Sequence, residues 1–169
     1  DLSKAFDCLV HDLLIAKLSA YGFDYLSLKL ILSYLSDRHQ RVRINSCYSS
    51  WNEIIFGVPQ GSILGPDLFN IYTSDLFLFL ILEIANYADD NSPFSCSDSI
   101  PSVISQLENE CVILLRWMRL NGLMANPTKF HLILSERDDA QSLTIDQHVI
   151  KNSEYENLLG IKIDNKMAF

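Results

Sequence analysis

Two adjacent carboxylates in the middle of the chain place the strongest constraint on how it can fold. Asp89 and Asp90 follow a strand-like segment, residues 77–87, and precede a short return segment, residues 91–94. On one strand the two side chains would point to opposite faces, whereas a tight turn can bring both carboxylates to one place. We therefore expect a β-hairpin with an acidic tip. Carboxylate oxygens suit hard cations such as Mg²⁺, although Asp is also common in solvated turns that bind nothing.

The other elements are predicted from the spacing of apolar residues and chain breakers. Helices are expected over residues 13–20, 25–35, 63–75 and 103–118, the first with Asp12 as its N-cap. Strands are expected over residues 40–44, 51–56, 129–134 and 155–163, and the apolar run 76–82 reads as part of a buried strand. Helices and strands alternate irregularly and include hairpins. The predicted fold class is therefore α+β, with a mostly antiparallel sheet and packed helices.

Length and composition indicate one globular domain. The chain has 169 residues, of which 49% are hydrophobic and 20% charged, and it contains no repeat or linker-like tract. We expect it to be cut from a longer protein at both ends. Its four cysteines form no CxxC pair, so the pattern favours reduced thiols in an intracellular protein over a zinc site, and it leaves a disulfide open. The apolar run 76–82 is far shorter than the roughly 18 residues of a membrane span, so no membrane is expected as a partner.

The charge pattern is mixed. The net charge of −8 opposes binding to a polyanion, so either the chain does not bind nucleic acid or its basic partners lie elsewhere. Arg38, Arg41 and Arg43 form the densest basic segment. This segment is either a phosphate contact or a solvated strand edge protected by charge.

Five segments, taken together and in order, carry a family resemblance. They are residues 1–7 (DLSKAFD), 57–66 (GVPQGSILGP), 87–90 (YADD), 121–129 and 158–164. They resemble motifs A to E of the reverse transcriptases, and the GSILGP ending is similar to the enzymes of non-LTR (LINE-type) retrotransposons. The resemblance covers essentially the whole chain. It implies the catalytic palm of an RNA-directed DNA polymerase, with fingers and thumb largely missing.

The resemblance implies a metal centre. Asp1 matches the metal ligand of motif A, Asp89 and Asp90 match the acids of motif C, and the backbone carbonyl of Leu2 would help hold the nucleotide-bound ion. Two Mg²⁺ ions, or Mn²⁺, are implied as cofactors. One would activate the primer 3′-OH and the other would stabilise the leaving oxygen, at a separation of roughly 4 Å.

The resemblance also assigns substrate-binding positions. Phe6 matches the aromatic steric gate that excludes a 2′-OH, although a Phe is more commonly a core residue. Pro59, Gln60 and Gly61 match the loop beside the incoming nucleotide and template, and an ordinary turn at a helix N-terminus is the alternative. Lys129 matches a lysine that assists pyrophosphate departure, with a solvated lysine as the alternative.

The last segment and the partners complete the implied picture. Leu158, Leu159 and Gly160 match the primer grip. The partners would be an RNA template, a DNA primer and deoxynucleoside triphosphates, in the nucleus or cytoplasm. Two alternatives stay open, a catalytically inactive palm remnant and a group II intron or retron enzyme. The segment on its own is expected to be inactive, because Asp1 would be poorly held and the net charge of −8 opposes primer binding.

Overall fold

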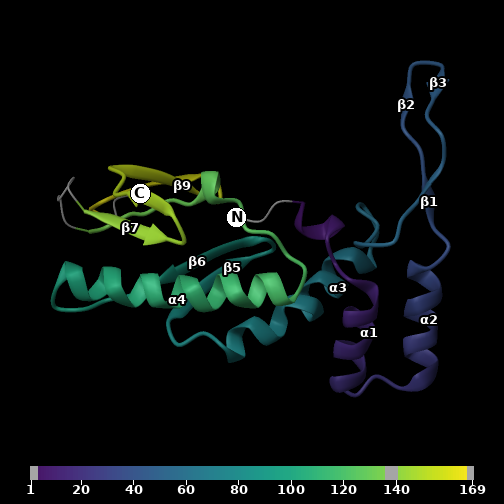
Figure 1. Ribbon diagram of the computed structural model, residues 1–169, viewed down its shortest axis with the longest axis horizontal. Coiled ribbons are helices and arrows are strands. Elements are labelled where there is room, and N and C mark those ends of the chain that lie inside the picture. Colours follow the sequence, from purple (N-terminus) through teal and green to yellow (C-terminus); the bar gives the residue numbers. More distant parts are fainter. Residues whose placement is uncertain (1–3, 136–140, 167–169) are drawn as a thin grey trace. The chain divides into compact units, whose positions relative to one another are not determined.

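The computed structural model describes residues 4–135 and 141–166 (Figure 1). The chain divides into two compact units. Of the described residues, we call 4–78 with 118–124 the N-terminal unit, and 79–117 with 125–135 and 141–166 the C-terminal unit. Within the described residues, no helix is both long and apolar enough to cross a membrane.

The N-terminal unit is built on three helices and a long hairpin. Its elements are η1 (Ala5–Asp7), α1 (His11–Ala20), α2 (Tyr25–Leu35), β1 (His39–Gln40), β2 (Arg43–Ile44), β3 (Cys47–Tyr48), β4 (Asn52–Glu53), α3 (Leu64–Thr73) and η2 (Ser74–Leu78). Asp24 is the N-cap of helix α2, and its carboxylate accepts the backbone N–H groups of Leu26 and Ser27 at 2.8 and 3.0 Å. These hydrogen bonds hold the pKa of Asp24 below its usual range. The prediction that Asp12 caps α1 was wrong, because the helix already starts at His11 and Val10 occupies the N-cap.

The core of the N-terminal unit lies among α1, α2 and α3. Its largest fully buried side chains include Leu14, Leu18, Leu35, Phe69 and Tyr72. The Tyr72 hydroxyl donates to the carbonyl of Asn121 at 2.6 Å, which satisfies a polar group inside this core. Lys17 binds Asp75 at 2.7 Å, and burial lowers the pKa of its ammonium while Asp75 opposes that shift.

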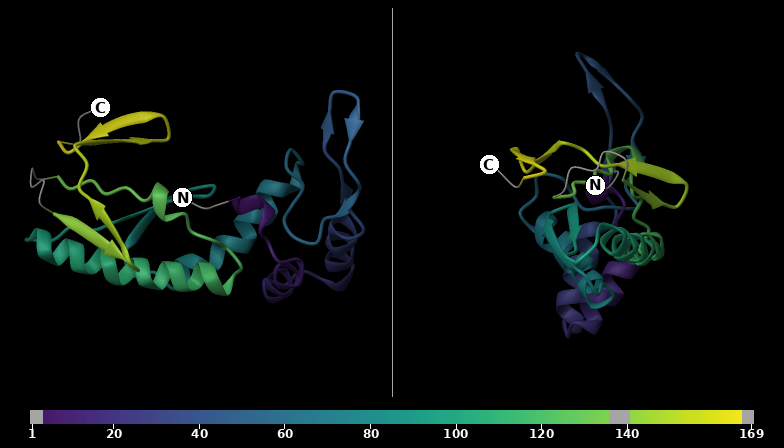
Figure 2. Two further views of the ribbon diagram at one scale, coloured as in Figure 1. Left: turned by 45° about the horizontal axis from the view of Figure 1, so that its top comes forward. Right: turned by 90° about the vertical axis from the view of Figure 1, so that its left-hand side faces the viewer.

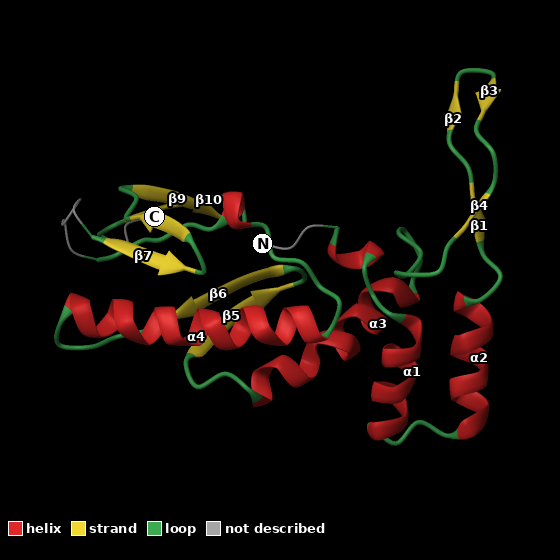
Figure 3. Ribbon diagram, viewed as in Figure 1, coloured by secondary structure: helices red, strands yellow, loops and turns green. Residues whose placement is uncertain are grey.

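The C-terminal unit combines one long helix with three hairpins (Figure 3). Its elements are β5 (Glu83–Tyr87), β6 (Asp90–Phe94), η3 (Pro127–Lys129), β7 (Ser142–Ile145), β8 (His148–Lys151), β9 (Tyr155–Leu158), β10 (Ile161–Asp164) and all but the last turn of α4 (Ile100–Leu120). Helix α4 buries one face, which includes Leu107 and Leu114, and the β7–β8 hairpin buries Leu143 and Ile150. The N–H of Thr144 in β7 donates to the carboxylate of Glu108 in α4 at 2.7 Å. Cys111 lies on the same buried face, and desolvation raises the pKa of its thiol to about 11.

The strands pair as local hairpins. All five ladders within the described residues are two-stranded and antiparallel, so the structure contains α+β elements without the single sheet that we expected. Figure 2 shows β7–β8 and β9–β10 as separate hairpins from two further directions. Residues 155–163, predicted as one strand, turn back at Leu159 and Gly160, which both have positive φ. Gly tolerates this conformation without steric cost, and the pair of residues closes a tight turn.

Two further strand predictions were wrong. The run 76–82 was expected to be buried, but its first part is the 3₁₀ helix η2, and Phe77, Leu78 and Ile81 are exposed. The buried carboxylate of Glu110 accepts the backbone N–H groups of Ile81 and Leu82, so a side chain takes the place of a partner strand. The segment 129–134 contributes only one isolated bridge, from Leu132 to Asn152.

Candidate active site

The acidic pair lies at the tip of the β5–β6 hairpin in the C-terminal unit. The ladder runs from Glu83 opposite Phe94 to Tyr87 opposite Asp90, which leaves Ala88 and Asp89 as a two-residue turn. Ala88 has a φ of 53°, the left-handed conformation that such a turn requires. The predicted acidic hairpin is therefore confirmed, with Asp89 in the turn and Asp90 as the first residue of β6. Both residues are half-buried.

Two asparagines hold the backbone of this tip. The Asn86 amide donates to the carbonyl of Ala88 at 3.2 Å and to the side-chain oxygen of Asn91 at 3.0 Å. The Asn91 amide in turn donates to the carbonyl of Asp89 at 3.1 Å. These bonds fix the path of the main chain and leave the two carboxylates out of the network.

The carboxylates of Asp89 and Asp90 are available for a cation. Among residues 4–135 and 141–166, neither accepts a hydrogen bond through its side chain or pairs with a basic group. Two unneutralised carboxylates on neighbouring residues are a donor set that fits a hard divalent ion. Within the described residues, no group of three or more His, Cys, Asp or Glu side chains is arranged so that it could hold a metal ion. Asp1, the third predicted ligand, and Leu2 lie outside them.

In the N-terminal unit, the loop that follows Phe56 crosses η1 at very short range. The N–H of Gly57 donates to the carbonyl of Leu9, and that of Val58 to the carbonyl of Phe6, each at 2.8 Å. A Cβ on Gly57 would lie 2.7 Å from the Cα of Asp7 and from the carbonyl oxygen of Phe6. Only a glycine fits there, and its φ of 80° also requires one. This crossing joins the segments that resemble motifs A and B.

The predicted substrate-binding loop continues from this crossing. The side-chain amide of Gln60 donates to the carboxylate of Asp7 at 2.8 Å, across 53 positions of sequence. The carbonyl of half-buried Pro59 accepts the Ser62 hydroxyl at 2.6 Å. Gly61 is exposed and has a φ of 77°, and a Cβ added to it would have no neighbouring atom within 4 Å. The loop leads directly into α3, so it is also the N-terminal turn of a helix.

Phe6 lies on the same turn and rests on the core. Its ring stacks on Phe69 with 4.4 Å between centroids and 26° between planes. Phe69 is 1% exposed, whereas Phe6 is half-buried and so keeps part of its ring accessible. A rigid aromatic with one supported face suits a steric gate, and the same stacking suits a residue at the margin of a core.

The two remaining predicted positions lie in the C-terminal unit. Lys129 ends η3 and is exposed. Leu158, Leu159 and Gly160 form the exposed end of the β9–β10 hairpin. In the same unit, His131 pairs with Glu156 of β9 at 3.0 Å.

Several residues at these sites were not singled out from the sequence. Asp7 is the partner of Gln60, the His11 ring bonds the carbonyl of Gly57 at 2.7 Å, and Asn86 organises the acidic tip. The only signal available was position: Asp7 ends the motif A segment, His11 lies four residues after it, and Asn86 directly precedes the YADD segment. The partner of each one is set by backbone geometry that residue spacing does not reveal.

The candidate site residues fall into two sets, one in each unit. Phe6, Pro59, Gln60 and Gly61 come together in the N-terminal unit, and Asp89 lies with Asp90 in the C-terminal unit. Each set is ordered by contacts within its own unit. The first set offers a partly accessible aromatic ring and an oriented side-chain amide, and the second has the charge of a cation site.

The comparison with known families gives the class of protein. Residues 1–163 match the family model "Reverse transcriptase (RNA-dependent DNA polymerase)", and the chain belongs to this family. This confirms the family that the sequence motifs indicated.

The individual relatives are polymerases of mobile elements. The chain is 27% identical, over its whole length, to the "RNA-directed DNA polymerase from mobile element jockey" of Drosophila melanogaster, and 30% identical to the protein of the same name from Drosophila funebris. It is 28% identical to the "Probable RNA-directed DNA polymerase from transposon BS" of Drosophila melanogaster. In each case the match covers the whole of this chain but only 19% or 20% of the relative. The chain therefore spans about a fifth of the length of the relatives that it matches.

Proposed function

We propose that this chain is the catalytic palm of a retrotransposon RNA-directed DNA polymerase, which adds deoxynucleotides to a primer 3′-OH as it copies RNA. Family membership supports the reaction class. The observation that carries the proposal is the pair of carboxylates, Asp89 and Asp90, held at a hairpin tip with no cation of the described residues beside them.

The proposed roles are given for each unit in turn. Asp89 and Asp90, with Asp1, would hold divalent metal ions, and the Leu2 carbonyl would add one oxygen ligand. When bound, Mg²⁺ would lower the pKa of the primer hydroxyl and stabilise charge on the departing pyrophosphate. Asn86 and Asn91 keep the acidic tip in shape by holding its main chain. Rigid placement matters because phosphoryl transfer depends mainly on positioning and electrostatics.

The loop after Gly57 would form the floor for the incoming nucleotide. Gln60 is oriented by Asp7, so its side chain has a defined direction before any substrate binds. The supported ring of Phe6 would exclude a 2′-OH by occupying its space. Lys129 would neutralise pyrophosphate, and Leu158, Leu159 and Gly160 would contact the primer.

The test is primer extension on an RNA template, with Mg²⁺ and deoxynucleotides, by the full-length polymerase that contains this chain. Asp89→Asn keeps the shape of the turn and removes one metal ligand, so the rate should fall at least about a hundredfold while the melting temperature stays unchanged. Such a loss corresponds to about 2.7 kcal/mol of transition-state stabilisation. Asp98→Asn, a change of one acid outside the motifs, is the matched control. Near-normal extension by Asp89→Asn would contradict the assignment and leave the inactive-remnant alternative standing.

A further inference from the structure

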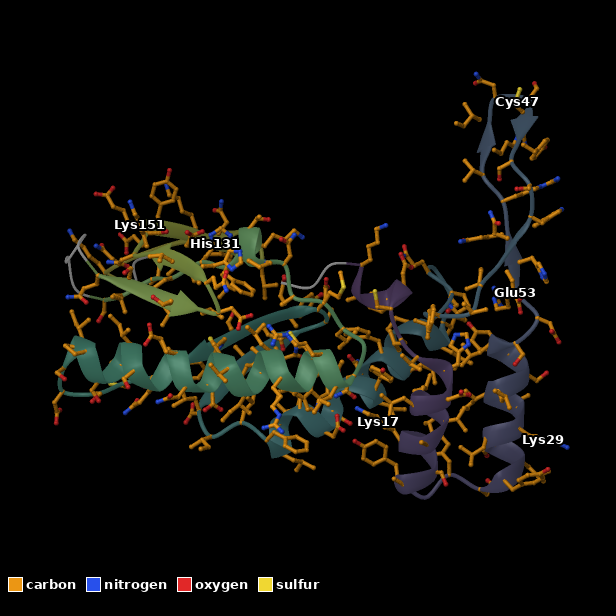
Figure 4. The ribbon with its side chains drawn as sticks, viewed as in Figure 1. Lys17, Lys29, Cys47, Glu53, His131 and Lys151 are labelled. Atoms are coloured by element: carbon orange, nitrogen blue, oxygen red, sulfur yellow. The ribbon has the colours of Figure 1, made fainter. Side chains whose placement is uncertain are left out.

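The long hairpin of the N-terminal unit has no evident role in the core. Residues 38–53, which we call the basic arm, pair His39 with Glu53 near its base and Arg43 with Tyr48 near its tip. Figure 4 labels Cys47 at the tip and Glu53 at the base of this slender projection. Every residue from His39 to Glu53 is exposed. From His39 onwards, the basic arm therefore buries no side chain that would explain its sequence by packing.

The basic arm differs in charge from the rest of the chain. It has three arginines and one glutamate, a net charge of +2, whereas the whole chain carries −8 and the other 153 residues therefore carry −10. No carboxylate among residues 4–135 and 141–166 forms an ion pair with Arg38, Arg41 or Arg43. A local excess of unpaired guanidinium groups on an acidic chain is complementary to a polyanion.

Arg41 joins the basic arm to a pair of exposed aromatic rings. Its guanidinium carbon lies 4.0 Å from the centroid of the Tyr48 ring and 4.5 Å from that of Trp51. Tyr48 is 50% exposed and Trp51 59% exposed, so both rings also keep accessible surface. Stacking restrains the guanidinium plane, while its N–H groups stay available to oxygen acceptors.

Combined cationic and aromatic groups select a particular form of nucleic acid. Guanidinium groups bind phosphate, and exposed aromatic rings stack on bases that are not already stacked in a duplex. The competing explanation is that the cation–π contacts only stabilise an isolated hairpin whose edges are protected by charge. That explanation accounts for Arg41, and for Arg43, whose guanidinium carbon lies 5.5 Å from the Tyr48 centroid and whose Nε donates to the carbonyl of Asn45 at 3.0 Å. It does not explain why both rings keep accessible surface.

We propose that the basic arm binds single-stranded RNA, with Arg41 and Arg43 on phosphates and Tyr48 and Trp51 against bases. The proposal rests on the proposed function only in that an RNA-copying enzyme has such a strand to hold. Binding of RNA by the basic arm does not require the metal site.

The test measures binding of the 169-residue chain to a labelled single-stranded RNA by fluorescence anisotropy, in EDTA and without nucleotides. Arg41→Gln should weaken binding about fivefold or more and lower the slope of log K against log salt by about 0.7, the value for one phosphate contact on a single strand. Lys29→Gln is the matched control, because it also removes one exposed cation over a tyrosine ring, at 5.4 Å, in the same unit. That control should change binding by less than about twofold.

A second readout follows Trp51 itself. The chain has two tryptophans, and Trp117 is only 5% exposed, so RNA should quench mainly Trp51. The quenching should disappear in Trp51→Phe, which keeps an aromatic ring, while binding stays within about threefold. Duplex RNA of the same length should compete at least about tenfold less well.

The outcomes separate this inference from the proposed function. Equal effects of Arg41→Gln and Lys29→Gln, absence of RNA binding, or no quenching of Trp51 would overturn the inference. If Asp89→Asn abolishes extension while Arg41→Gln binds RNA normally, only the proposal that the basic arm binds RNA is wrong. If Arg41→Gln weakens RNA binding while Asp89→Asn extends normally, only the catalytic proposal is wrong.

Discussion

The two units hold their own sets of candidate site residues in opposite ways. In the N-terminal unit, the loop at Gly57 is fixed by hydrogen bonds and close backbone contact with residues about fifty positions earlier. In the C-terminal unit, Asp89 and Asp90 are held by a hairpin whose bonds at the tip come from residues within five positions. One part depends on long-range packing, and the other depends on a local turn. Substitutions at the Gly57 crossing should therefore lower the stability of the fold, whereas substitutions at the acidic tip should mainly change the geometry of the turn.

The largest effect is expected at the crossing of the two N-terminal segments. Gly57→Ala adds a Cβ 2.7 Å from backbone atoms at a φ of 80°, and should lower the free energy of unfolding by about 3 kcal/mol. Gly61→Ala is the control, because its φ of 77° is equally unfavourable but its surroundings are open, and it should cost about 1 kcal/mol. Urea unfolding of the two variants measures the difference. Equal losses would mean that the crossing is not tightly packed.

An intermediate effect is expected at Phe6. Phe6→Val removes the ring that stacks on Phe69, and should raise incorporation of ribonucleotides relative to deoxynucleotides by about tenfold, or about 1.4 kcal/mol of discrimination. Competition between the two nucleotide types in single-nucleotide extension gives the ratio. Phe94→Val is the control, at an exposed position of the C-terminal unit, and should leave the ratio of ribonucleotide to deoxynucleotide incorporation unchanged. If selectivity stays the same in Phe6→Val while stability falls, Phe6 serves only the core.

The smallest effect on folding is expected at the acidic tip. Asn86→Ala removes hydrogen bonds that are exposed and local, so the free energy of unfolding should fall by less than about 1 kcal/mol. The extension rate should nevertheless fall, by a larger factor than the small loss of stability explains, because the main chain at Asp89 and Asp90 is no longer held in place. Asn109→Ala, at an exposed position of α4, controls for the loss of an amide. A stability loss comparable to that of Gly57→Ala would erase the contrast between the units.

Local patterns in the sequence were sufficient to predict several elements of the structure. Helix α2 has its predicted bounds, and the acidic hairpin turns where the two carboxylates required it. Both are determined by residues close in sequence, a capped apolar helix and a short turn. The family was likewise readable from short motifs, because each motif is contiguous.

Long-range partners could not be predicted in this way. The run 76–82 looked like a buried strand because periodicity cannot detect Glu110, which binds the backbone of Ile81 and Leu82 from 29 and 28 positions away. The pairing of Gln60 with Asp7 was equally invisible, since it depends on how the loop at Gly57 crosses η1. The roles of Asp1 and Leu2 rest on the family resemblance, as these residues lie outside the described part of the chain.

The proposed function requires that Asp1, in the segment that resembles motif A, shares one metal site with Asp89 and Asp90, in the segment that resembles motif C. Fe²⁺ can replace Mg²⁺ in such a site, and with ascorbate and peroxide it cleaves the polypeptide close to where it is bound. In the full-length polymerase with primer, template and nucleotide, we predict cleavage within residues 1–7 and within residues 86–92, and loss of both cuts in Asp89→Asn. Cleavage near the acidic hairpin alone, or cuts that persist in Asp89→Asn, would contradict a shared site.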